Sequence, residues 1–270
     1  FYERYDSMIY AEERYNNIMR LLTEKGRISS AELSSALNIS RETIRRDLNR
    51  LAQEGRLVKT RGGAILPDAS LTSLDFPYTA REKANRTEKS DLCAYAARFI
   101  QERDTIFLDN SSTVTHLIRF IPKQYPLNLL VYSIPLLLTL SNMHNPNWNV
   151  FSLGGMLSYT TMSSTRTLAL SALDNFMPTK AFLSCHSITK DLHATDSYME
   201  DVELKRRALD ISAETFLLAD ASKLNHPGVI KVASSVEFDH IITNEKAAPF
   251  FVNDLRENGC NVHLAPHITK

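Results

Sequence analysis

The amino-acid sequence predicts a two-domain protein in which a small helical domain precedes a larger α/β domain with a mostly parallel sheet. The chain has 270 residues, which exceeds the usual size of one domain. Its first 66 residues place apolar side chains at helical spacing, whereas beyond residue 80 short apolar runs alternate with helical stretches. The apolar fraction of 43% and the charged fraction of 23% are typical of a folded globular chain.

The first domain, residues 1–66, is predicted to contain three helices and a short hairpin. These elements are expected over residues 12–25, 29–37, 41–54 and 56–65. Ser29 as N-cap and Glu32 three residues later form the pattern of a capping box. The third helix buries Ile44, Leu48 and Leu51 along one side, and a Gly-Gly pair turns the hairpin.

Residues 67–80 lack apolar periodicity and are predicted to be a linker, so the second domain covers residues 81–270. Its helices are expected over residues 82–101, 113–121, 134–143, 167–176, 201–214 and 246–258. Its strands are expected over residues 105–108, 129–132, 150–153, 181–185, 216–219, 241–243 and 262–265. Strands that alternate with helices imply a parallel sheet covered on both faces.

The second and third helices are joined by a tight turn, which is the arrangement of a helix-turn-helix. The chain as a whole is neutral, with 31 Lys+Arg and 31 Asp+Glu, but residues 40–61 carry a net charge of +4. This pattern predicts a face that binds double-stranded DNA through side chains able to reach bases or phosphates. The candidate contacts are Ser40, Arg41, Thr43, Arg45, Arg46, Lys59 and Arg61. Charge alone leaves open a helical protein-protein module with a solvated basic face.

Residue identities favour the DNA-binding alternative. Thr43-Ile-Arg-Arg-Asp-Leu48 and Arg61-Gly-Gly-Ala64 closely resemble motifs of DeoR-family bacterial transcription regulators, although Arg61 stands where the family usually has His. The resemblance continues through residue 245. It implies a winged helix-turn-helix followed by an effector domain similar in fold to pentose-phosphate isomerases and CoA transferases. It also implies an effector that is a phosphorylated sugar or a related metabolite.

In the second domain, the loop that joins the first predicted strand to the helix after it offers a place for a phosphate group. Backbone N–H groups and hydroxyls at a helix start can bind an anion. The candidate residues are Asp109, Ser111, Ser112 and Thr113. The alternative is that these hydroxyls only cap the helix. Ser111 occupies the usual glycine position of the family signature.

Three further elements resemble the family, and one position departs from it. Asp220-Ala-Ser-Lys223 matches its Asp-x-Ser-Lys motif, in which Lys223 would neutralise phosphate and Asp220 would accept sugar hydroxyls; a local ion pair is the alternative. Ser133 would donate to the ligand or cap a turn, and Lys205 is either a site cation or part of a solvated helix face. Arg166 stands where most relatives have Gly, and we expect it to narrow effector choice by binding a second anionic group.

Other chemistry has weaker support in the sequence. His263, His267 and Cys260 are ligand types suited to zinc, but Pro266 interrupts a helical arrangement, so we expect neither a bound metal ion nor a cofactor. Three scattered cysteines and an apolar stretch too short to span a bilayer favour a cytoplasmic protein.

We therefore expect a transcription regulator without enzymatic activity, which represses carbohydrate-metabolism genes as a homo-oligomer on an operator. The alternative is a sugar-phosphate isomerase-like enzyme fused to a DNA-binding domain. Asp220 and Lys223 would then transfer protons.

Overall fold

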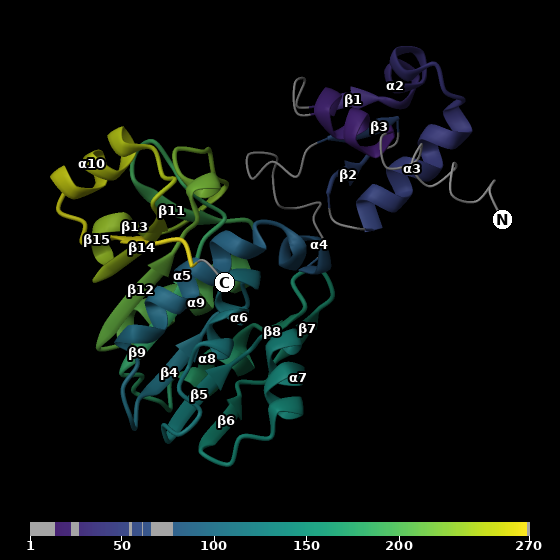
Figure 1. Cartoon of the computed structure of the whole chain (residues 1–270). Helices are drawn as coiled ribbons and strands as arrows, with labels where there is room; N and C mark the ends of the chain where they lie inside the picture. The colour runs from purple at the N-terminus through teal and green to yellow at the C-terminus, as the bar shows by residue number, and fades with distance from the viewer. Residues whose placement is uncertain (1–13, 23–26, 54–55, 61, 66–77, 269–270) are drawn as a thin grey trace. The chain divides into compact units, whose positions relative to one another are not determined.

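The computed structural model describes residues 14–22, 27–53, 56–60, 62–65 and 78–268, and it divides the chain into two compact units at Leu71 and Thr72 (Figure 1). Each unit has its own hydrophobic core. Within the described ranges, no helix combines the length and the apolar character needed to cross a membrane.

The first unit packs three helices against a small antiparallel sheet. A helix over residues 14–22 precedes β1 (Arg27–Ser29), α2 (Ser30–Leu37), α3 (Arg41–Gln53), β2 (Val58–Lys59) and β3 (Gly63–Ile65). The predicted capping box is present, because Ser29 Oγ accepts from Glu32 N at 3.1 Å while Glu32 Oε2 accepts from Ser29 N at 2.8 Å. Strand β1 was not predicted. It pairs with β3, and Gly63 is required there because a Cβ atom would lie 2.1 Å from the carbonyl oxygen of Ile28.

The second unit is built on a seven-stranded sheet in which every strand pair is parallel. Its strands are β4 (Thr105–Leu108), β5 (Leu127–Val131), β6 (Trp148–Ser152), β9 (Lys180–Ser184), β12 (Glu214–Leu218), β14 (His240–Asn244) and β15 (Val262–Ala265). They are arranged in the order β15-β14-β12-β9-β4-β5-β6. The predicted α/β class is confirmed.

Two separate cores lie on the two faces of this sheet, since successive side chains of a strand point to opposite faces. One core contains Phe182 and Phe216 together with apolar side chains of α5 (Arg86–Ala96), α6 (Ser112–Thr115) and α7 (Ile134–Met143). The other contains Leu183 and Leu217 together with side chains of α8 (Thr167–Leu173), α9 (Met199–Ile211) and α10 (Pro249–Glu257).

Several short strands were missed by the sequence analysis. They are the antiparallel hairpin of β7 (Met156–Ser158) and β8 (Ser163–Thr165), and a small antiparallel sheet of β10 (Ser187–Ile188), β11 (His193–Asp196) and β13 (Ile230–Ser234). Gly155 has φ +114° beside the hairpin, and a Cβ atom there would lie 2.3 Å from the carbonyl oxygen of Thr165. These strands pair across loops and carry no apolar run that would mark them.

The start of the second unit differs from the sequence analysis. Most of the expected linker lies outside the described residues, but α4 (Tyr78–Lys83) begins inside it, and Tyr78 Oη donates to Thr115 Oγ1 at 3.0 Å. The single helix predicted over residues 82–101 is interrupted at Asn85, which has a left-handed conformation with φ +50°.

Candidate functional site

The polar residues predicted for a ligand site gather where the strand order reverses. From β4 the chain runs outward through β5 and β6, then returns to β9 and continues outward on the other side. In open α/β sheets the ligand crevice lies outside the carboxyl ends of the strands at such a switch point. Asp109 directly follows β4, and Ser184 is the last residue of β9. Both residues therefore stand at the carboxyl ends of the strands, where a ligand is expected.

Asp109 is fully buried and ties these two strand ends together. One carboxylate oxygen accepts from the backbone N–H of Ser111 at 2.9 Å, and the other accepts from the backbone N–H of Ser184 at 2.7 Å. Lys205 Nζ lies 3.1 Å from the second oxygen. Since both carboxylate oxygens already have partners within the protein, Asp109 fixes the relative positions of the residues around it.

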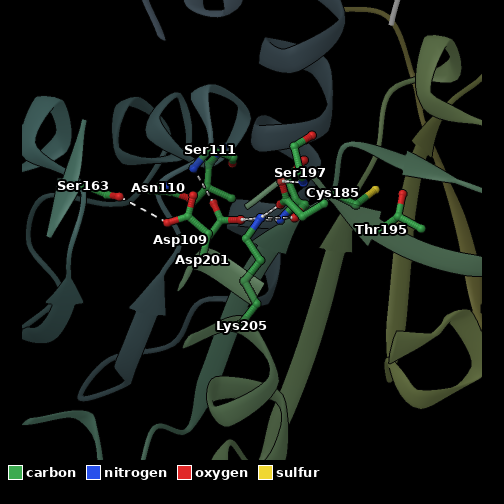
Figure 2. A network of polar contacts seen from close by, with 12 residues as sticks. Asp109, Asn110, Ser111, Ser163, Cys185, Thr195, Ser197, Asp201 and Lys205 are labelled. Atoms are coloured by element: carbon green, nitrogen blue, oxygen red, sulfur yellow. Dashed lines mark hydrogen bonds and ion pairs between the residues drawn. The ribbon is translucent and has the colours of Figure 1, made fainter. Parts of the chain in front are cut away.

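Lys205 is a buried cation and not part of a solvated helix face, because its side chain is only 2% exposed. Its Nζ atom lies 2.5 Å from Asp196 Oδ2 and donates to the carbonyl oxygen of Ser184 at 2.7 Å (Figure 2). Burial alone lowers the pKa of Lys205, but Asp109 and Asp196 together raise that pKa above its ordinary value. Lys205 is therefore charged and held between two carboxylates.

Asp201, which the sequence analysis missed, lies one turn before Lys205 on α9. Ser163 Oγ donates to its Oδ1 atom at 3.2 Å. Burial, reinforced by the charge of Asp196, raises the pKa of Asp201 to about 6. The buried polar network therefore extends from the carboxyl end of β4 to strand β8 (Figure 2).

Two of the predicted hydroxyls have the capping role that the sequence analysis gave as the alternative. Ser111 Oγ accepts from Val114 N at 3.0 Å and caps α6, and Ser133 Oγ accepts from Leu136 N at 3.4 Å and caps α7. Both helices therefore begin at the carboxyl ends of the strands, where a ligand is expected. The hydroxyl of Thr113 is buried and has no hydrogen-bond partner among the described residues.

Lys89 on α5 is a site residue that the sequence analysis missed. Its side chain is 4% exposed, and its ammonium donates to Ser112 Oγ at 3.1 Å and to the carbonyl oxygen of Arg81. Burial is the main reason why the pKa of Lys89 falls to about 7, and the nearby charge of Lys223 lowers it further. A buried ammonium whose hydrogen bonds go to neutral groups is suited to an anionic ligand.

The Asp220–Lys223 turn also lies at the switch point, because Lys223 contacts the carboxyl end of β9. Lys223 Nζ donates to Ser184 Oγ at 2.9 Å and to the carbonyl oxygen of Cys185 at 2.7 Å, so its contacts run to β9 rather than to Asp220. Asp220 Oδ1 accepts from Ser222, and Asp220 Oδ2 is buried without a hydrogen-bond partner in the described part of the chain. Asn85 Nδ2 donates to Ser222 Oγ at 2.9 Å, which joins the turn to the start of α5.

In the first unit, α3 presents exposed cations on the side opposite its apolar stripe. Ser40 Oγ caps this helix by accepting from Thr43 N at 3.2 Å, and the two hydroxyl oxygens lie 2.9 Å apart. Arg41, Arg45 and Arg46 are exposed. Glu42 Oε1 lies 3.0 Å from Arg45 and 3.6 Å from Arg46; such exposed pairs are weak and are readily exchanged for phosphate contacts.

The hairpin is linked to α3 by a side-chain contact. Lys59 Nζ on β2 donates to Asn49 Oδ1 on α3 at 2.6 Å. Lys59 is exposed, and Arg61 lies outside the described residues. Asp47, inside the Thr43–Leu48 motif, is buried and accepts from Arg14 at 2.9 Å, so this carboxylate joins α3 to the first helix, over residues 14–22.

Comparison with known proteins identifies both units. Residues 14–70 match the family described as the DeoR-like helix-turn-helix domain, and residues 84–245 match the DeoR C terminal sensor domain. The chain belongs to the DeoR family. The resemblance read from the motifs of the sequence is confirmed, and the protein is a DeoR-family transcriptional regulator.

Three curated relatives of this DeoR-family regulator align along most of both chains. The uncharacterized HTH-type transcriptional regulator YulB of Bacillus subtilis is 30% identical over 94% of this chain and 96% of its own length. The lactose phosphotransferase system repressor of Lactococcus lactis is 29% identical over 88% and 92%. The L-fucose operon activator of Escherichia coli is 29% identical over 86% and 95%.

Among solved structures, ribose 5-phosphate isomerase A of Methanocaldococcus jannaschii is similar with a TM-score of 0.39 and 14% identity. The similarity covers 52% of this chain and 55% of the isomerase chain.

Arg166 departs from the family in a way that its backbone makes clear. It has φ +72° and ψ −166°, a conformation that is essentially confined to glycine. Its side chain is half exposed and donates to Glu200 at 2.9 Å. Arg166 thus combines a backbone conformation that favours glycine with a cation that pairs with Glu200 on α9.

The histidines considered as zinc ligands have separate partners in this DeoR-family regulator. His263 Nε2 lies 2.9 Å from His240 Nδ1, whereas His267 Nδ1 lies 3.0 Å from Asp91. The described part of the chain contains no group of three or more His, Cys, Asp or Glu side chains able to hold a metal ion.

Proposed function

We propose that this DeoR-family regulator represses carbohydrate-metabolism genes as a homo-oligomer on double-stranded operator DNA in the cytoplasm, under the control of a phosphorylated sugar or related metabolite. Two relatives are described as a lactose phosphotransferase system repressor and an L-fucose operon activator. These names support a carbohydrate-related pathway.

The observation that carries the effector proposal is a concentration of cations beside unsatisfied polar groups. The charges of Lys223 and Arg81 both lower the pKa of Lys89, so all three cations lie near one another. Arg81 Nε is buried without a hydrogen-bond partner among the described residues, as is the hydroxyl of Thr113. Buried polar groups are normally paired, so these atoms support a site completed by an anionic ligand.

Within this site we assign the phosphate to Lys89, Lys223, Ser112 and Thr113. Asp220 would accept hydrogen bonds from sugar hydroxyls through its unpaired Oδ2 atom. Asp109, Ser111, Ser133 and Lys205 would maintain the shape of the site, since their polar atoms already serve the protein. Arg166 would act at the rim, where releasing Glu200 would allow it to bind a second anionic group.

On the DNA side, the first turns of α3 supply the proposed base contacts. Arg41, Thr43 and Arg45 would reach base edges in the major groove, and Arg46 and Ser40 would bind phosphate. Asn49 holds Lys59 beside this helix, and Lys59 and Arg61 would contact the backbone or the adjacent groove.

A thermal-shift screen tests the effector proposal. Phosphorylated sugars are compared with the corresponding free sugars and sugar alcohols, because a ligand that binds the native state raises its Tm. We expect phosphorylated compounds alone to raise Tm, and Lys223→Ala to abolish this shift. Lys231→Ala, which removes an exposed lysine on β13, serves as the matched control and should respond normally. A normal response of Lys223→Ala would remove Lys223 from the site.

Operator binding and turnover are measured on the same proteins. Full-length protein should bind its own promoter fragment with a strong dependence on salt, and Lys223→Ala should bind the fragment as wild type does. We expect no conversion of any sugar phosphate in the screen. Catalytic turnover would favour the isomerase-like alternative, and the absence of salt-sensitive promoter binding would contradict the regulator proposal.

A further inference from the structure

One segment of the sensor unit carries no charged side chain over an unusual length. The 42 residues between Lys123 and Arg166 contain no Asp, Glu, Lys or Arg. At the usual charged fraction of about a quarter, a segment of this length would contain about ten. The segment forms strands β5 to β8 and helix α7, so it includes a large surface as well as core.

Strand β6 is the edge of the seven-stranded sheet on this side. It pairs with β5 alone among the described strands, and four of its five residues are exposed. Soluble proteins commonly protect such edges with Lys, Pro, a bulge or a covering element. Strand β6 has the sequence Trp-Asn-Val-Phe-Ser, which includes neither Lys nor Pro.

Exposed apolar side chains lie along this edge and on the hairpin that follows it. Val150 is 40% exposed and Phe151 is 39% exposed, on opposite faces of β6. Met156 and Leu157 on β7 are also exposed, and Tyr159 in the β7–β8 turn is 83% exposed. We name these five residues the β6 edge patch.

The first two charged residues that follow the segment are paired within the chain. Arg166 pairs with Glu200 at 2.9 Å, and Asp174 pairs with Arg207 at 2.6 Å. Both pairs join an end of helix α8 to α9. The surface that remains is apolar and neutral, which is the composition of the core of a protein-protein interface.

We propose that the β6 edge patch is the surface through which two sensor units of this chain associate, with the β6 strands of two copies paired antiparallel across a two-fold axis. In such an isologous interface each side chain faces a copy of its own surface, so any net charge would repel itself. A patch without charges is compatible with this self-pairing. A strand edge is also self-complementary, since a two-fold rotation about an axis perpendicular to the sheet brings the N–H donors of one strand opposite the C=O acceptors of its copy.

A second copy fits this surface better than another protein would. A distinct partner allows opposite charges to provide specificity and orientation, and the segment offers none. A continuous sheet across the axis would also remove the free edge in both copies.

The mass of the full-length protein in solution tests the proposal. Val150→Lys places a charge at the centre of β6, and Met156→Lys places one on β7 where the exposed side chain tolerates it. Val236→Lys is the matched control, because Val236 is 55% exposed but lies on a different element, the turn over Ser235–Glu237. We expect wild type and Val236→Lys to have the same multiple of the 30.6-kDa chain mass.

Both patch variants should show a fall in mass and at least a tenfold rise in the dissociation constant for self-association, measured by sedimentation at several concentrations. Melting curves identify any variant that fails to fold. If one patch variant does not fold, the mass of the other patch variant tests the proposal. Unchanged mass in a folded patch variant would overturn the proposal, as would a monomeric wild type at micromolar concentration. Because mass is measured without DNA or metabolite, this test is independent of the effector and operator proposals.

Cross-linking provides a second readout. Val150→Cys would bring two thiols together at the axis, where antiparallel neighbours have Cα separations compatible with a disulfide. The three native cysteines are buried, so their background reaction is small. We expect oxidation to link Val150→Cys into covalent dimers and to leave Val236→Cys monomeric on a denaturing gel. Equal cross-linking of both variants would contradict the proposed pairing of β6 strands.

Discussion

The Nζ atom of Lys89 lies 3.1 Å from the Oγ atom of Ser112, so a buried ammonium joins helix α5 to the first residue of α6. These residues are far apart in sequence, and neither has a pattern that marks it as a partner of the other. Their contact places Lys89, whose pKa is about 7, near the carboxyl ends of the strands, where a ligand is expected.

Effector binding should weaken as the pH rises above 7. The pKa of Lys89 is about 7 in the free protein, and an anionic ligand favours the charged form, so binding takes up a proton above that pH. Affinity for the phosphorylated sugar with the largest thermal shift should fall by up to about tenfold per pH unit between pH 7 and 9. Calorimetric titration in two buffers of different ionisation enthalpy measures the proton uptake. Lys89→Met should bind more weakly with a flat pH profile, and an equal slope in this variant would assign the proton elsewhere.

Replacing Arg166 by Gly should stabilise the protein. The Arg166 backbone has φ +72° and ψ −166°, which disfavours any side chain by about 1–3 kcal/mol. Arg166→Ala is the control, because it also loses the exposed pair with Glu200 but retains the strain. The free energy of unfolding, measured by denaturant titration, should be higher for Arg166→Gly than for Arg166→Ala. Equal values would show that the conformation is not strained. If Arg166 also selects the effector, the glycine variant will respond to a broader set of compounds.

Gly155→Ala should destabilise the sensor unit much more than Gly154→Ala. Both glycines have positive φ, but only at Gly155 would a Cβ atom meet backbone, 2.3 Å from the carbonyl oxygen of Thr165. The conformational penalty alone is about 1 kcal/mol, and the clash at Gly155 adds to it. Melting temperatures of the two variants provide the comparison. Similar losses would mean that the β7–β8 hairpin moves away without cost.

Arg45→Ala should weaken specific operator binding by about 1–3 kcal/mol if Arg45 contacts a base. Glu42→Gln is the matched variant, because it releases Arg45 and Arg46 from their carboxylate partner while keeping the helix. This variant should bind DNA at least as well as wild type. Fluorescence anisotropy with operator and unrelated fragments separates the two effects. Loss of affinity on both fragments alike would assign Arg45 to the phosphate backbone.

Periodic apolar patterns predicted most of the fold. The predicted strands at Thr105–Leu108 and Val262–Ala265 agree with the structure at both ends, as does helix Ile134–Met143. In the strand Thr105–Leu108, burial between two helical layers accounts for the continuous apolar run. Strands such as Ser187–Ile188 were missed because they are too short to show an alternating or continuous apolar pattern.

The site was only partly predictable for a similar reason. Asp109 and Lys223 stand at strand ends, which local sequence reveals, and the structure brings them together around Ser184. Lys89 lies in a charged stretch that resembles a solvated helix face. Its burial and its lowered pKa depend on the packing of α5 against the loop after β4, which no local pattern encodes.

Lys89 and Lys223 lie on two elements that already contact each other. Asn85, at the start of α5, donates to Ser222 in the Asp220–Lys223 turn. A metabolite whose phosphate binds both lysines would therefore add a second link between α5 and this turn.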